Sequence, residues 1–453
     1  MSVAPARKAA LTVLQRVRER EAFGPETLDA VLRAAGLSSQ DANLATRLTY
    51  GTLETMGTLD DAIDRYVTHP DSVEPQVRDA LRLAAYELLF ARTPARAAVN
   101  EGVEGVKSVR RQAAGMANAV LRRIADASTT FPWGDPAADD DALARATAHP
   151  RWMVDRWIAD LGRERAIAAL NADIGPAPLY LWWNPFRGSI VEAMDALVED
   201  GAEPLADIPT GCIRAGNAQG AVRGRAVGEG RVLVTDAAAQ LAAAACGGHP
   251  GGIVVDIASG RGTKTAQLQA LSVAAGGPAH LYALDIHAFK AGVLARRMHD
   301  LCVPDVTPLT GDALDPASID GLPAPGTADA VLVDAPCSGL GSLRRRPEKR
   351  WRVSPDDVPR LASLQFEMLR AAASLVRVGG RVVYSTCTVL RAENHEVASA
   401  FLSGSDGAFV TADITDAVPT EWRAGVDERG WFQSTPQAGG PDGHFVAAFT
   451  RVG

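Results

Sequence analysis

Two stretches of the chain deliver a cysteine directly after an apolar run of the kind that forms β-strands. Residues 331–341 read Val-Leu-Val-Asp-Ala-Pro-Cys-Ser-Gly-Leu-Gly, which places Asp334 and then Cys337 after the run. Residues 382–388 read Val-Val-Tyr-Ser-Thr-Cys-Thr and bring Cys387 to the end of a second run. In open α/β sheets ligands bind outside the carboxyl ends of the strands, so we expect both thiols and the acid at a substrate site. Such a pair of thiols predicts covalent catalysis.

The segment that carries these residues alternates short strands with helices, from about Val232 to the C-terminus. That order is typical of a parallel sheet covered on both faces, and we expect a doubly wound α/β domain over residues 229–453. Its first unit is a strand at 253–257, a glycine-rich turn at 258–264 and then a helix. This succession predicts a nucleotide cofactor at the turn.

The turn alone does not decide which cofactor binds. Nicotinamide dehydrogenases use the same turn to place a phosphate on a helix N-terminus. Here Gly260 and Gly262 lack the third spaced glycine, and two cysteines stand where a dehydrogenase needs a hydride-transfer site. S-adenosylmethionine fits better, because it has no pyrophosphate and needs acids for its ribose and its adenine amine. Asp285, ending the second strand, and Asp312, after the third, are at the expected positions.

The composition is that of a globular protein. The 453 residues are 47% hydrophobic and 22% charged, and no apolar run approaches the ~20 residues of a membrane-spanning helix. The N-terminus lacks the apolar block of a secretory signal, so we expect a cytoplasmic protein. Neither a Cys-x-x-Cys pair nor a zinc-like histidine spacing occurs, which predicts no metal and reduced thiols at all five cysteines, namely Cys212, Cys246, Cys302, Cys337 and Cys387.

The net charge of −8 and the pI near 5.6 argue against indiscriminate nucleic-acid binding. One local run is different: residues 343–352 carry six cations and one acid, with Trp351 among them. Taken alone, such a run is a solvated charged surface. Its place directly after the Cys337 loop favours a role at the site.

Residues 1–127 are expected to be helical, because apolar residues recur at spacings of three and four, as at Leu81, Ala84 and Leu88. Ser38 to Asp41 offers a helix start. Residues 128–148 begin with a stretch rich in Pro, Gly, Ala and Asp and are expected to be a linker. Residues 149–228 are expected to form a small α+β connector. Its Trp182-Trp183 pair is suited to stacking on bases, although buried packing is the favoured interpretation.

The helical segment resembles the NusB-type RNA-binding domain. The resemblance covers nearly the whole segment and is carried by residues 47–53, 81–90, 98–101 and 118–123.

The two cysteine motifs resemble those of the RsmB/Sun branch of RNA 5-methylcytosine methyltransferases. The signal is Asp-Ala-Pro-Cys at 334–337 together with Ser-Thr-Cys at 385–387, and further matching segments are 235–240, 391–394 and 442–447. The resemblance implies a Rossmann-like domain that uses S-adenosyl-L-methionine to methylate carbon 5 of a cytosine in small-subunit (16S) ribosomal RNA. It also implies that the NusB-like domain positions the RNA.

The resemblance further implies roles for individual residues. Cys387 would add to carbon 6 of the cytosine, since carbon 5 is too poor a nucleophile by itself. Cys337 would assist product release, and Asp334 would support protonation of the ring nitrogen. The basic cluster 344–352 would hold flanking phosphates of an extruded, single-stranded target. The implied cofactor-binding residues are Ala258, Ser259, Gly260, Arg261, Gly262, Thr263, Lys264, Asp285, Lys290, Asp312 and Asp334.

The sequence also departs from the family pattern. The usual cofactor loop reads Cys-Ala-Ala-Pro-Gly-Gly-Lys-Thr, so Arg261 replaces a proline and Thr263 a glycine. Trp182-Trp183-Asn184 stands where the family commonly has Arg-Val-Asn, and an RNA contact through that arginine is not expected here. Three alternatives stay open: a non-catalytic RNA-binding assembly factor with an altered loop, methylation of a cytosine in another RNA, and a dehydrogenase.

Overall fold

The structure, a computed structural model, describes residues 3–20 and 24–453. The chain forms two compact units. The helical unit comprises Met1–Pro176 and the returning segment Leu343–Ser354, and the α/β unit comprises Ala177–Ser342 and Pro355–Gly453. The division differs from the expected domain scheme, because residues 149–176 of the predicted connector and the basic run 343–352 both belong to the helical unit.

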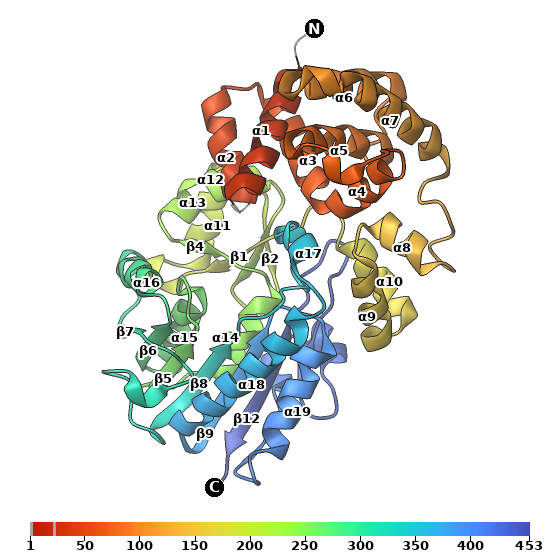
Figure 1. Ribbon diagram of the computed structural model, residues 1–453. Helices are drawn as coiled ribbons and strands as arrows, with labels where there is room; N and C mark the ends of the chain where they lie inside the picture. Colours follow the sequence, from red (N-terminus) through yellow and green to blue (C-terminus); the bar gives the residue numbers. More distant parts are fainter. Residues whose placement is uncertain (1–2, 21–23) are drawn as a thin grey trace. The chain divides into compact units, whose positions relative to one another are not determined.

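The helical unit is built from short helices joined by tight turns (Figure 1). Ser38 accepts a hydrogen bond from Asp41 N at 3.1 Å, which caps the third helix where the sequence offered a start. The expected linker contains a helix, since Asp139 caps it and Leu143 is buried. The helices are α1 (Pro5–Arg20), α2 (Gly24–Ala35), α3 (Ser39–Glu54), α4 (Met56–Asp64), α5 (Pro75–Leu89), α6 (Ala95–Val109), α7 (Ala114–Ala127), α8 (Asp140–Thr147), α9 (Arg151–Leu161), α10 (Arg163–Ala172) and α17 (Lys349–Arg352).

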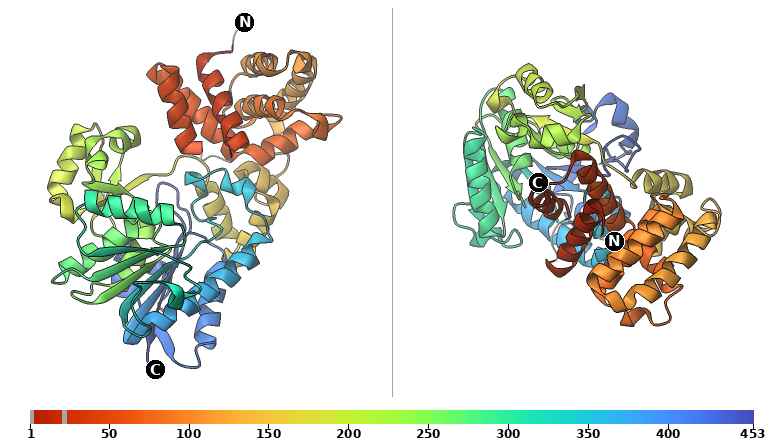
Figure 2. Two further views of the ribbon diagram at one scale, coloured as in Figure 1. Left: turned by 60° about the vertical axis from the view of Figure 1, so that its left-hand side comes forward. Right: turned by 90° about the horizontal axis from the view of Figure 1, so that it is seen from above.

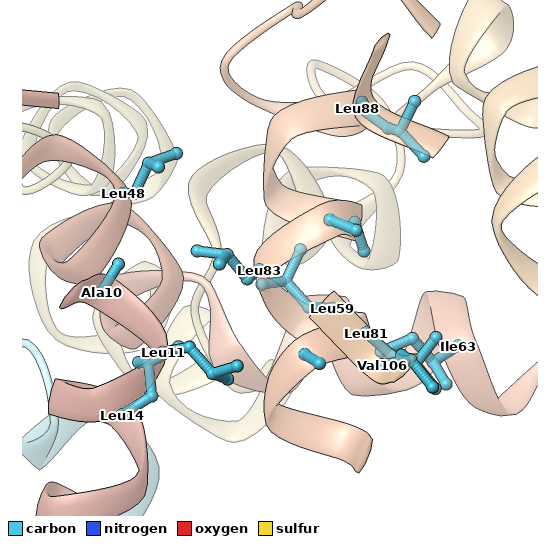
Figure 3. Close-up of a cluster of buried hydrophobic side chains, with 14 of the residues drawn as sticks. Ala10, Leu11, Leu14, Leu48, Leu59, Ile63, Leu81, Leu83, Leu88 and Val106 are labelled. Atoms are coloured by element: carbon cyan, nitrogen blue, oxygen red, sulfur yellow. The ribbon is translucent and has the colours of Figure 1, made fainter. Parts of the chain in front are cut away.

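The core of the helical unit consists of aliphatic side chains from several helices. Figure 3 shows Leu14 of α1, Leu48 of α3 and Leu81 of α5 in this cluster. Leu48 and Leu81 have no exposed surface, as the spacing of apolar residues predicted. Burial of such side chains supplies most of the free energy that holds short helices together.

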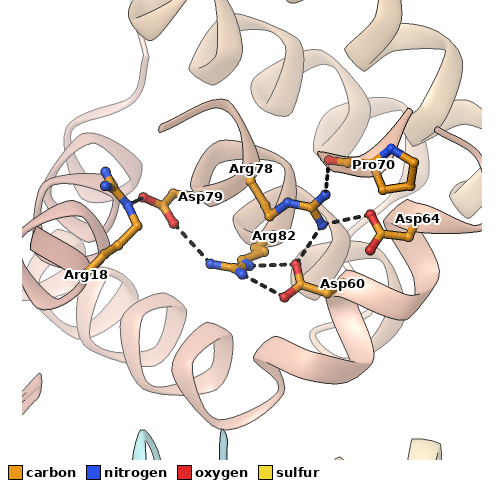
Figure 4. A network of polar contacts seen from close by, with 7 residues as sticks. All are labelled: Arg18, Asp60, Asp64, Pro70, Arg78, Asp79 and Arg82. Atoms are coloured by element: carbon orange, nitrogen blue, oxygen red, sulfur yellow. Dashed lines mark hydrogen bonds and ion pairs between the residues drawn. The ribbon is translucent and has the colours of Figure 1, made fainter. Parts of the chain in front are cut away.

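A chain of ion pairs ties α1, α4 and α5 to one another (Figure 4). Asp79 accepts from Arg18 at 2.9 Å and from Arg82 at 3.2 Å. Arg82 also makes a two-point contact with Asp60, at 2.8 and 2.6 Å, and Asp60 in turn pairs with Arg78 at 3.2 Å. Two-point arginine–carboxylate geometry fixes direction as well as distance, so the network orients these helices.

The α/β unit begins with a small antiparallel sheet. Trp182 lies in the core with 8% of its surface exposed, so the packing interpretation holds for this residue. Asn184 is buried and donates to the carbonyls of Gly230 and Leu301, at 2.9 and 3.2 Å. The strand order is β2-β3-β1-β4. The strands are β1 (Leu179–Trp183), β2 (Pro204–Asp207), β3 (Cys212–Ala215) and β4 (Val232–Val234), and the helices are α11 (Ile190–Glu199), α12 (Ala218–Arg223) and α13 (Arg225–Gly228).

The main sheet has the order β10-β12-β9-β8-β5-β6-β7, and β11 pairs with β12. Strands β12, β9, β8, β5, β6 and β7 can be found in Figure 1, and Figure 2 shows the sheet from two further sides. The expectation of a parallel sheet is correct from β9 to β7 and wrong at the other edge, where β12 and β10 run antiparallel. No α-helix of the described chain lies between β10 and β12, and antiparallel neighbours need no helical crossover. The strands are β5 (Ile253–Ile257), β6 (His280–Asp285), β7 (Val306–Thr310), β8 (Ala328–Asp334), β9 (Val376–Thr386), β10 (Phe409–Ala412), β11 (Phe432–Gln433) and β12 (Phe445–Arg451).

Helices cover both faces of this sheet. One buried cluster joins the sheet to side chains such as Leu241, Leu268 and Leu294, and the other joins it to side chains such as Leu369 and Phe401. The helices are α14 (Leu241–Cys246), α15 (Thr263–Ala274) and α16 (Ala288–Asp300) for the first cluster, and α18 (Asp357–Leu375) and α19 (His395–Ser403) for the second. Within residues 3–20 and 24–453, no helix is both long enough and apolar enough to cross a membrane.

We predicted that the cations of the basic run 343–352 hold phosphates as a group, and this prediction is wrong for the buried cations of the run. Arg350 is fully buried and donates to Asp173 Oδ2 at 2.9 Å and to the Glu54 carbonyl at 3.2 Å. His149, whose pKa burial lowers to about 4, lies 3.1 Å from the same Asp173 oxygen. Arg344 is buried too. A buried guanidinium with carboxylate and carbonyl partners is a structural anchor, so only the outer cations of this run face solvent.

We expect the substitution Arg350→Ala to lower the free energy of unfolding by about 3–5 kcal/mol, because the Asp173 carboxylate would stay buried without its cation. Urea titration of the full chain measures this loss. Arg346→Ala is the control, since Arg346 is an exposed cation of the same run, and it should change stability by less than about 0.5 kcal/mol. Equal effects of the two substitutions would show that Arg350 contributes no more than a surface charge.

Candidate active site

Cys337 and Cys387 lie side by side at the carboxyl ends of β8 and β9. The two strands are parallel, with Asp334 opposite Ser385, so the chain leaves both at the same edge of the sheet. The sulfur atoms are 3.3 Å apart, well beyond the ~2.05 Å of a disulfide, and both residues are thiols. Both are partly exposed. The edge predicted from the sequence therefore carries two adjacent sulfurs.

The Cys337 thiol resists ionisation. The hydrogen bond to Cys387 raises the pKa of Cys337 well above its usual value, and burial raises it further. Elsewhere in the unit, burial raises the pKa of Cys212 to about 12 and that of Cys246 higher still, so those thiols are inert.

Asp334 is paired with a cation that lies near Cys387. Lys264 Nζ donates to Asp334 Oδ2 at 2.8 Å. Burial lowers the pKa of Lys264, but Asp334 and, more weakly, Cys387 outweigh it, so the net pKa is raised and the ammonium keeps its charge. Behind this pair, burial and then the nearby Asp334 raise the pKa of Asp256 to about 7, although the Thr265 hydroxyl donates to it at 2.6 Å.

A cavity of about 360 Å³ opens beside the cysteines. Six of the predicted cofactor-binding residues line it: Ala258, Gly260, Asp285, Lys290, Asp312 and Asp334. The remaining five, Ser259, Arg261, Gly262, Thr263 and Lys264, are not among its lining residues. The cavity therefore receives the ends of β5, β6, β7 and β8, as the sequence pattern predicted, while most of the turn serves another purpose.

The turn after β5 is shaped by its backbone. Ala258, Gly260 and Gly262 all have positive φ, which costs little for glycine. A Cβ on Gly262 would come within 2.7 Å of Met298, so this glycine allows α16 to pack closely on the turn. Arg261, at the family's proline position, is exposed, and its carbonyl accepts from Arg297 at 2.8 Å. Two of the departures from the family loop, Arg261 and Thr263, thus lie outside the cavity wall.

Asp285 is held rigidly at the cavity wall. Its Oδ1 accepts from His287 N at 2.9 Å, and its Oδ2 accepts from Gly260 N at 3.3 Å and from Lys290 at 3.4 Å. The residue is almost fully buried. Each carboxylate oxygen has two lone pairs, so Asp285 keeps capacity to accept bonds from a ligand in the cavity.

Several lining residues were missed by sequence reasoning. Ile286 follows the predicted acid directly and is 59% exposed, which is unusual for its type and marks a contact surface. Its position next to Asp285 was a usable signal. Leu364 and Met368 come from α18, one turn apart, and no sequence pattern indicated that this face of the helix reaches the cavity.

The scattered segments that carried the family resemblance lie together in the α/β unit. Asp236 accepts from Asp442 N at 3.2 Å and from Ala238 N at 2.9 Å. Gly341, at the end of the Cys337 loop, donates to the Cys387 carbonyl at 2.9 Å and accepts from Gly443 N at 2.8 Å. These contacts join the end of the Cys337 loop to the Cys387 loop and to the segment near Gly443.

Comparison with known families agrees with both units. The model described as 16S rRNA methyltransferase RsmB/F matches residues 245–450, and the NusB family model matches residues 4–126. A crystal structure of a methyltransferase homolog from Pyrococcus horikoshii superposes with a TM-score of 0.58 at 20% identity, covering 70% of this chain and 100% of that one. That likeness concerns the fold.

Curated relatives match over the whole length. The probable ribosomal RNA small subunit methyltransferase B of Bacillus subtilis is 30% identical over 453 residues, which covers 99% of each chain. A putative methyltransferase of Mycobacterium tuberculosis is 35% identical over 99% of this chain and 97% of its own. With the helical unit, the methyltransferase sheet and the full-length match in agreement, the chain belongs to the RsmB/F family of 16S ribosomal RNA methyltransferases.

Proposed function

We propose that the protein transfers a methyl group from S-adenosyl-L-methionine to carbon 5 of a cytosine in small-subunit ribosomal RNA, through a covalent adduct with Cys387. The observation that carries the proposal is the pair of sulfurs 3.3 Å apart beside an acid-lined cavity. Carbons 5 and 6 of a cytosine are bonded neighbours. Two adjacent thiols are therefore suited to act on both carbons of one bound ring.

Cys387 is the nucleophile in this proposal. Attack on carbon 6 requires a thiolate, and the raised pKa of Cys337 disfavours ionisation of that thiol, so we assign the attack to Cys387. A bond forms between its sulfur and carbon 6, and electron density moves across the ring toward carbon 5 and the ring nitrogen. Asp334, with Lys264 2.8 Å away, supports protonation of that nitrogen.

Cys337 is the base that releases the product. Its raised pKa depends first on the hydrogen bond to Cys387 and also on the charge of Cys387. Once the Cys387 sulfur is bonded to carbon it carries no charge, so the pKa of Cys337 falls. Cys337 can then give up its own proton to solvent, and the thiolate so formed removes the proton of methylated carbon 5. The electron pair re-forms the ring double bond, and the bond between Cys387 and carbon 6 breaks.

The cavity fits the proposed cofactor. Bound S-adenosylmethionine would supply an electrophilic methyl group to the site. Asp285 would accept the ribose hydroxyls, because its carboxylate is already fixed by two backbone N–H groups. Asp312 lines the same cavity and would accept from the adenine amine, next to the exposed apolar Ile286.

The substrate assignment is supported by the full-length relatives, which are named as methyltransferases of the small-subunit ribosomal RNA. A cytosine must leave its stack to meet the two sulfurs, which is easiest in single-stranded or looped RNA. The NusB-like unit would hold the surrounding RNA. Binding is expected to weaken with salt, since phosphate contacts dominate affinity for nucleic acids.

Asp285→Ala should weaken binding of S-adenosylmethionine. Hydrogen bonds to a charged group contribute about 1.5–3 kcal/mol, which corresponds to a roughly 10- to 100-fold rise in the dissociation constant. Isothermal calorimetry measures the constant directly. Asp315→Ala is the matched control, because Asp315 is an exposed acid outside the cavity wall. An unchanged constant for Asp285→Ala would place the ribose elsewhere.

The two cysteine variants should fail at different steps. We expect Cys387→Ala to bind cofactor and RNA but to transfer no methyl group. Cys337→Ala should attack and methylate but should retain its product, because the proton of carbon 5 has no base. After incubation with ribosomal RNA and S-adenosylmethionine, a denaturing gel should show a slow protein–RNA band for Cys337→Ala.

Two controls complete this experiment. The double variant Cys337→Ala, Cys387→Ala should give no slow band, and Cys302→Ala should behave as wild type, since Cys302 is an exposed thiol away from the site. If Cys337 were only a buried structural residue, Cys337→Ala would lose some stability because of the small cavity that the missing sulfur leaves, and it would form no adduct. Normal turnover without a band for Cys337→Ala would mean that another group releases the product.

A further inference from the structure

The residue after each cysteine contacts the residue after the other. Ser338 Oγ lies 2.9 Å from Thr388 Oγ1, and both side chains are buried. Glu393, at the end of the turn Arg391–Glu393, accepts the Ser338 backbone N–H at 2.8 Å on Oε1 and the Ser338 hydroxyl on Oε2. The Thr388 hydroxyl is a further hydrogen-bond partner of this carboxylate. Glu393 therefore joins the two loops that carry the sulfurs.

The Cys337 loop is held on both sides of its cysteine. After Cys337, the carboxylate of Glu393 takes the two donors of Ser338. Before Cys337, the carbonyl of Pro336 accepts from Gln365 Nε2 at 2.9 Å. Gln365 also donates to Glu393 Oε1 at 3.0 Å, so one buried pair of side chains fixes both flanks of this cysteine.

The Cys387 loop has its own support from Asn394. The Thr386 hydroxyl donates to Asn394 Oδ1 at 2.6 Å, and Asn394 Nδ2 donates to the Thr388 carbonyl at 3.0 Å. Asn394 is fully buried. Cys387 therefore stays anchored at both flanks by a residue other than Glu393, which makes the Cys337 loop the one that depends on the carboxylate.

A role in packing alone would not account for the free-energy cost of burying Glu393. It has no exposed surface, and burial raises its pKa. Its recorded partners are a backbone N–H, hydroxyls and an amide, all of them neutral donors. A buried carboxylate without a cation costs free energy that an apolar side chain of similar volume would not. What an apolar residue lacks is the ability to hold several donors of two loops at once.

We propose that Glu393 is the positioning residue that fixes Cys337 relative to Cys387. This inference rests on the proposed function, because it gives the fixed sulfur pair its purpose: one thiol bonds carbon 6 while the other reaches the proton on carbon 5. Such a task needs reacting groups held within about 0.5 Å of the productive geometry. Glu393 provides this by binding the Cys337 loop to the loop of the nucleophile.

The first test measures the sulfur pair without RNA or cofactor. Phenylarsine oxide bonds two thiols at once: two As–S bonds form, and the two thiol protons leave with the arsenic oxygen as one water, with no change of oxidation state. Tight binding requires adjacent sulfurs. We expect Glu393→Ala to weaken this binding roughly 10- to 100-fold, as the loss of hydrogen bonds to a charged group predicts.

Three variants frame that measurement. Cys337→Ala gives the background of single-thiol binding. Glu396→Ala, an exposed acid on α19, should bind the arsenical as wild type does. Ser338→Ala removes one hydroxyl and leaves the carboxylate and the backbone N–H in place, so it should weaken binding by roughly 2- to 10-fold. This milder variant answers the question if Glu393→Ala does not fold, which circular dichroism and thermal melting will show.

The second test separates positioning from general support of the fold. Glu393→Ala should form the RNA adduct, since Asn394 still anchors Cys387, but should release product slowly and accumulate the band seen for Cys337→Ala. Asn394→Ala should do the reverse and form little adduct. A residue that only stabilises the fold would lower both steps in proportion to the folded fraction.

The outcomes are distinguishable. Unchanged arsenical affinity in folded Glu393→Ala and Ser338→Ala would overturn the positioning role. Weakened arsenical binding by the two variants, together with a wild-type protein that methylates no cytosine, would support the positioning role of Glu393 and reject the proposed function. Weakened arsenical binding with equal loss of adduct formation and release would also reject the specific dependence of Cys337 on Glu393.

Discussion

The site depends on one shared proton. Cys337 and Cys387 are close enough that a negative charge on one sulfur is stabilised by the hydrogen of the other, and the pKa of Cys337 is raised chiefly for that reason. The two sulfurs also differ in their surroundings, since the charge of Glu393 acts on Cys337 and Lys264 lies near Cys387. When one sulfur is bonded to carbon, the other no longer faces a negative charge and becomes free to ionise. Sulfurs much farther apart would titrate independently.

Parallel strand pairing supplies the distance. Because β8 and β9 run side by side in register, Asp334 opposite Ser385, a short excursion after β8 brings Cys337 beside the residue that ends β9. The same edge of the sheet receives Asp285 from β6, fixed by backbone N–H groups of its own and neighbouring turns. The acid-lined cavity and the thiol pair thus share Asp334, which lines the cavity and holds Lys264.

Residues at strand ends could be predicted from the sequence, because an apolar run followed by an acid or a cysteine has few places to go in an α/β sheet. Asp285, Asp334, Cys337 and Cys387 followed that rule. Arg350 did not follow its local pattern. Among so many cations it resembled a surface charge, and only the fold brings Asp173 to its guanidinium. Ser259 and Thr263 were predicted to contact the cofactor by their place in the loop, yet the turn directs them away from the cavity wall. The antiparallel edge was missed because strand propensity carries no direction.

The buried carboxylate of Glu393 follows from the way in which the Cys337 loop leaves the sheet. A loop that leaves a strand to carry a cysteine gives up the ladder that would satisfy its backbone N–H groups, and a buried N–H must still find an acceptor. Ser338 N finds one in Glu393. An apolar residue there would leave this donor unpaired, at a cost of about 1–3 kcal/mol. An amide would offer one acceptor oxygen where the carboxylate offers two. Glu393, the acid that accepts the displaced backbone N–H, is therefore also the group that holds the Cys337 sulfur in place.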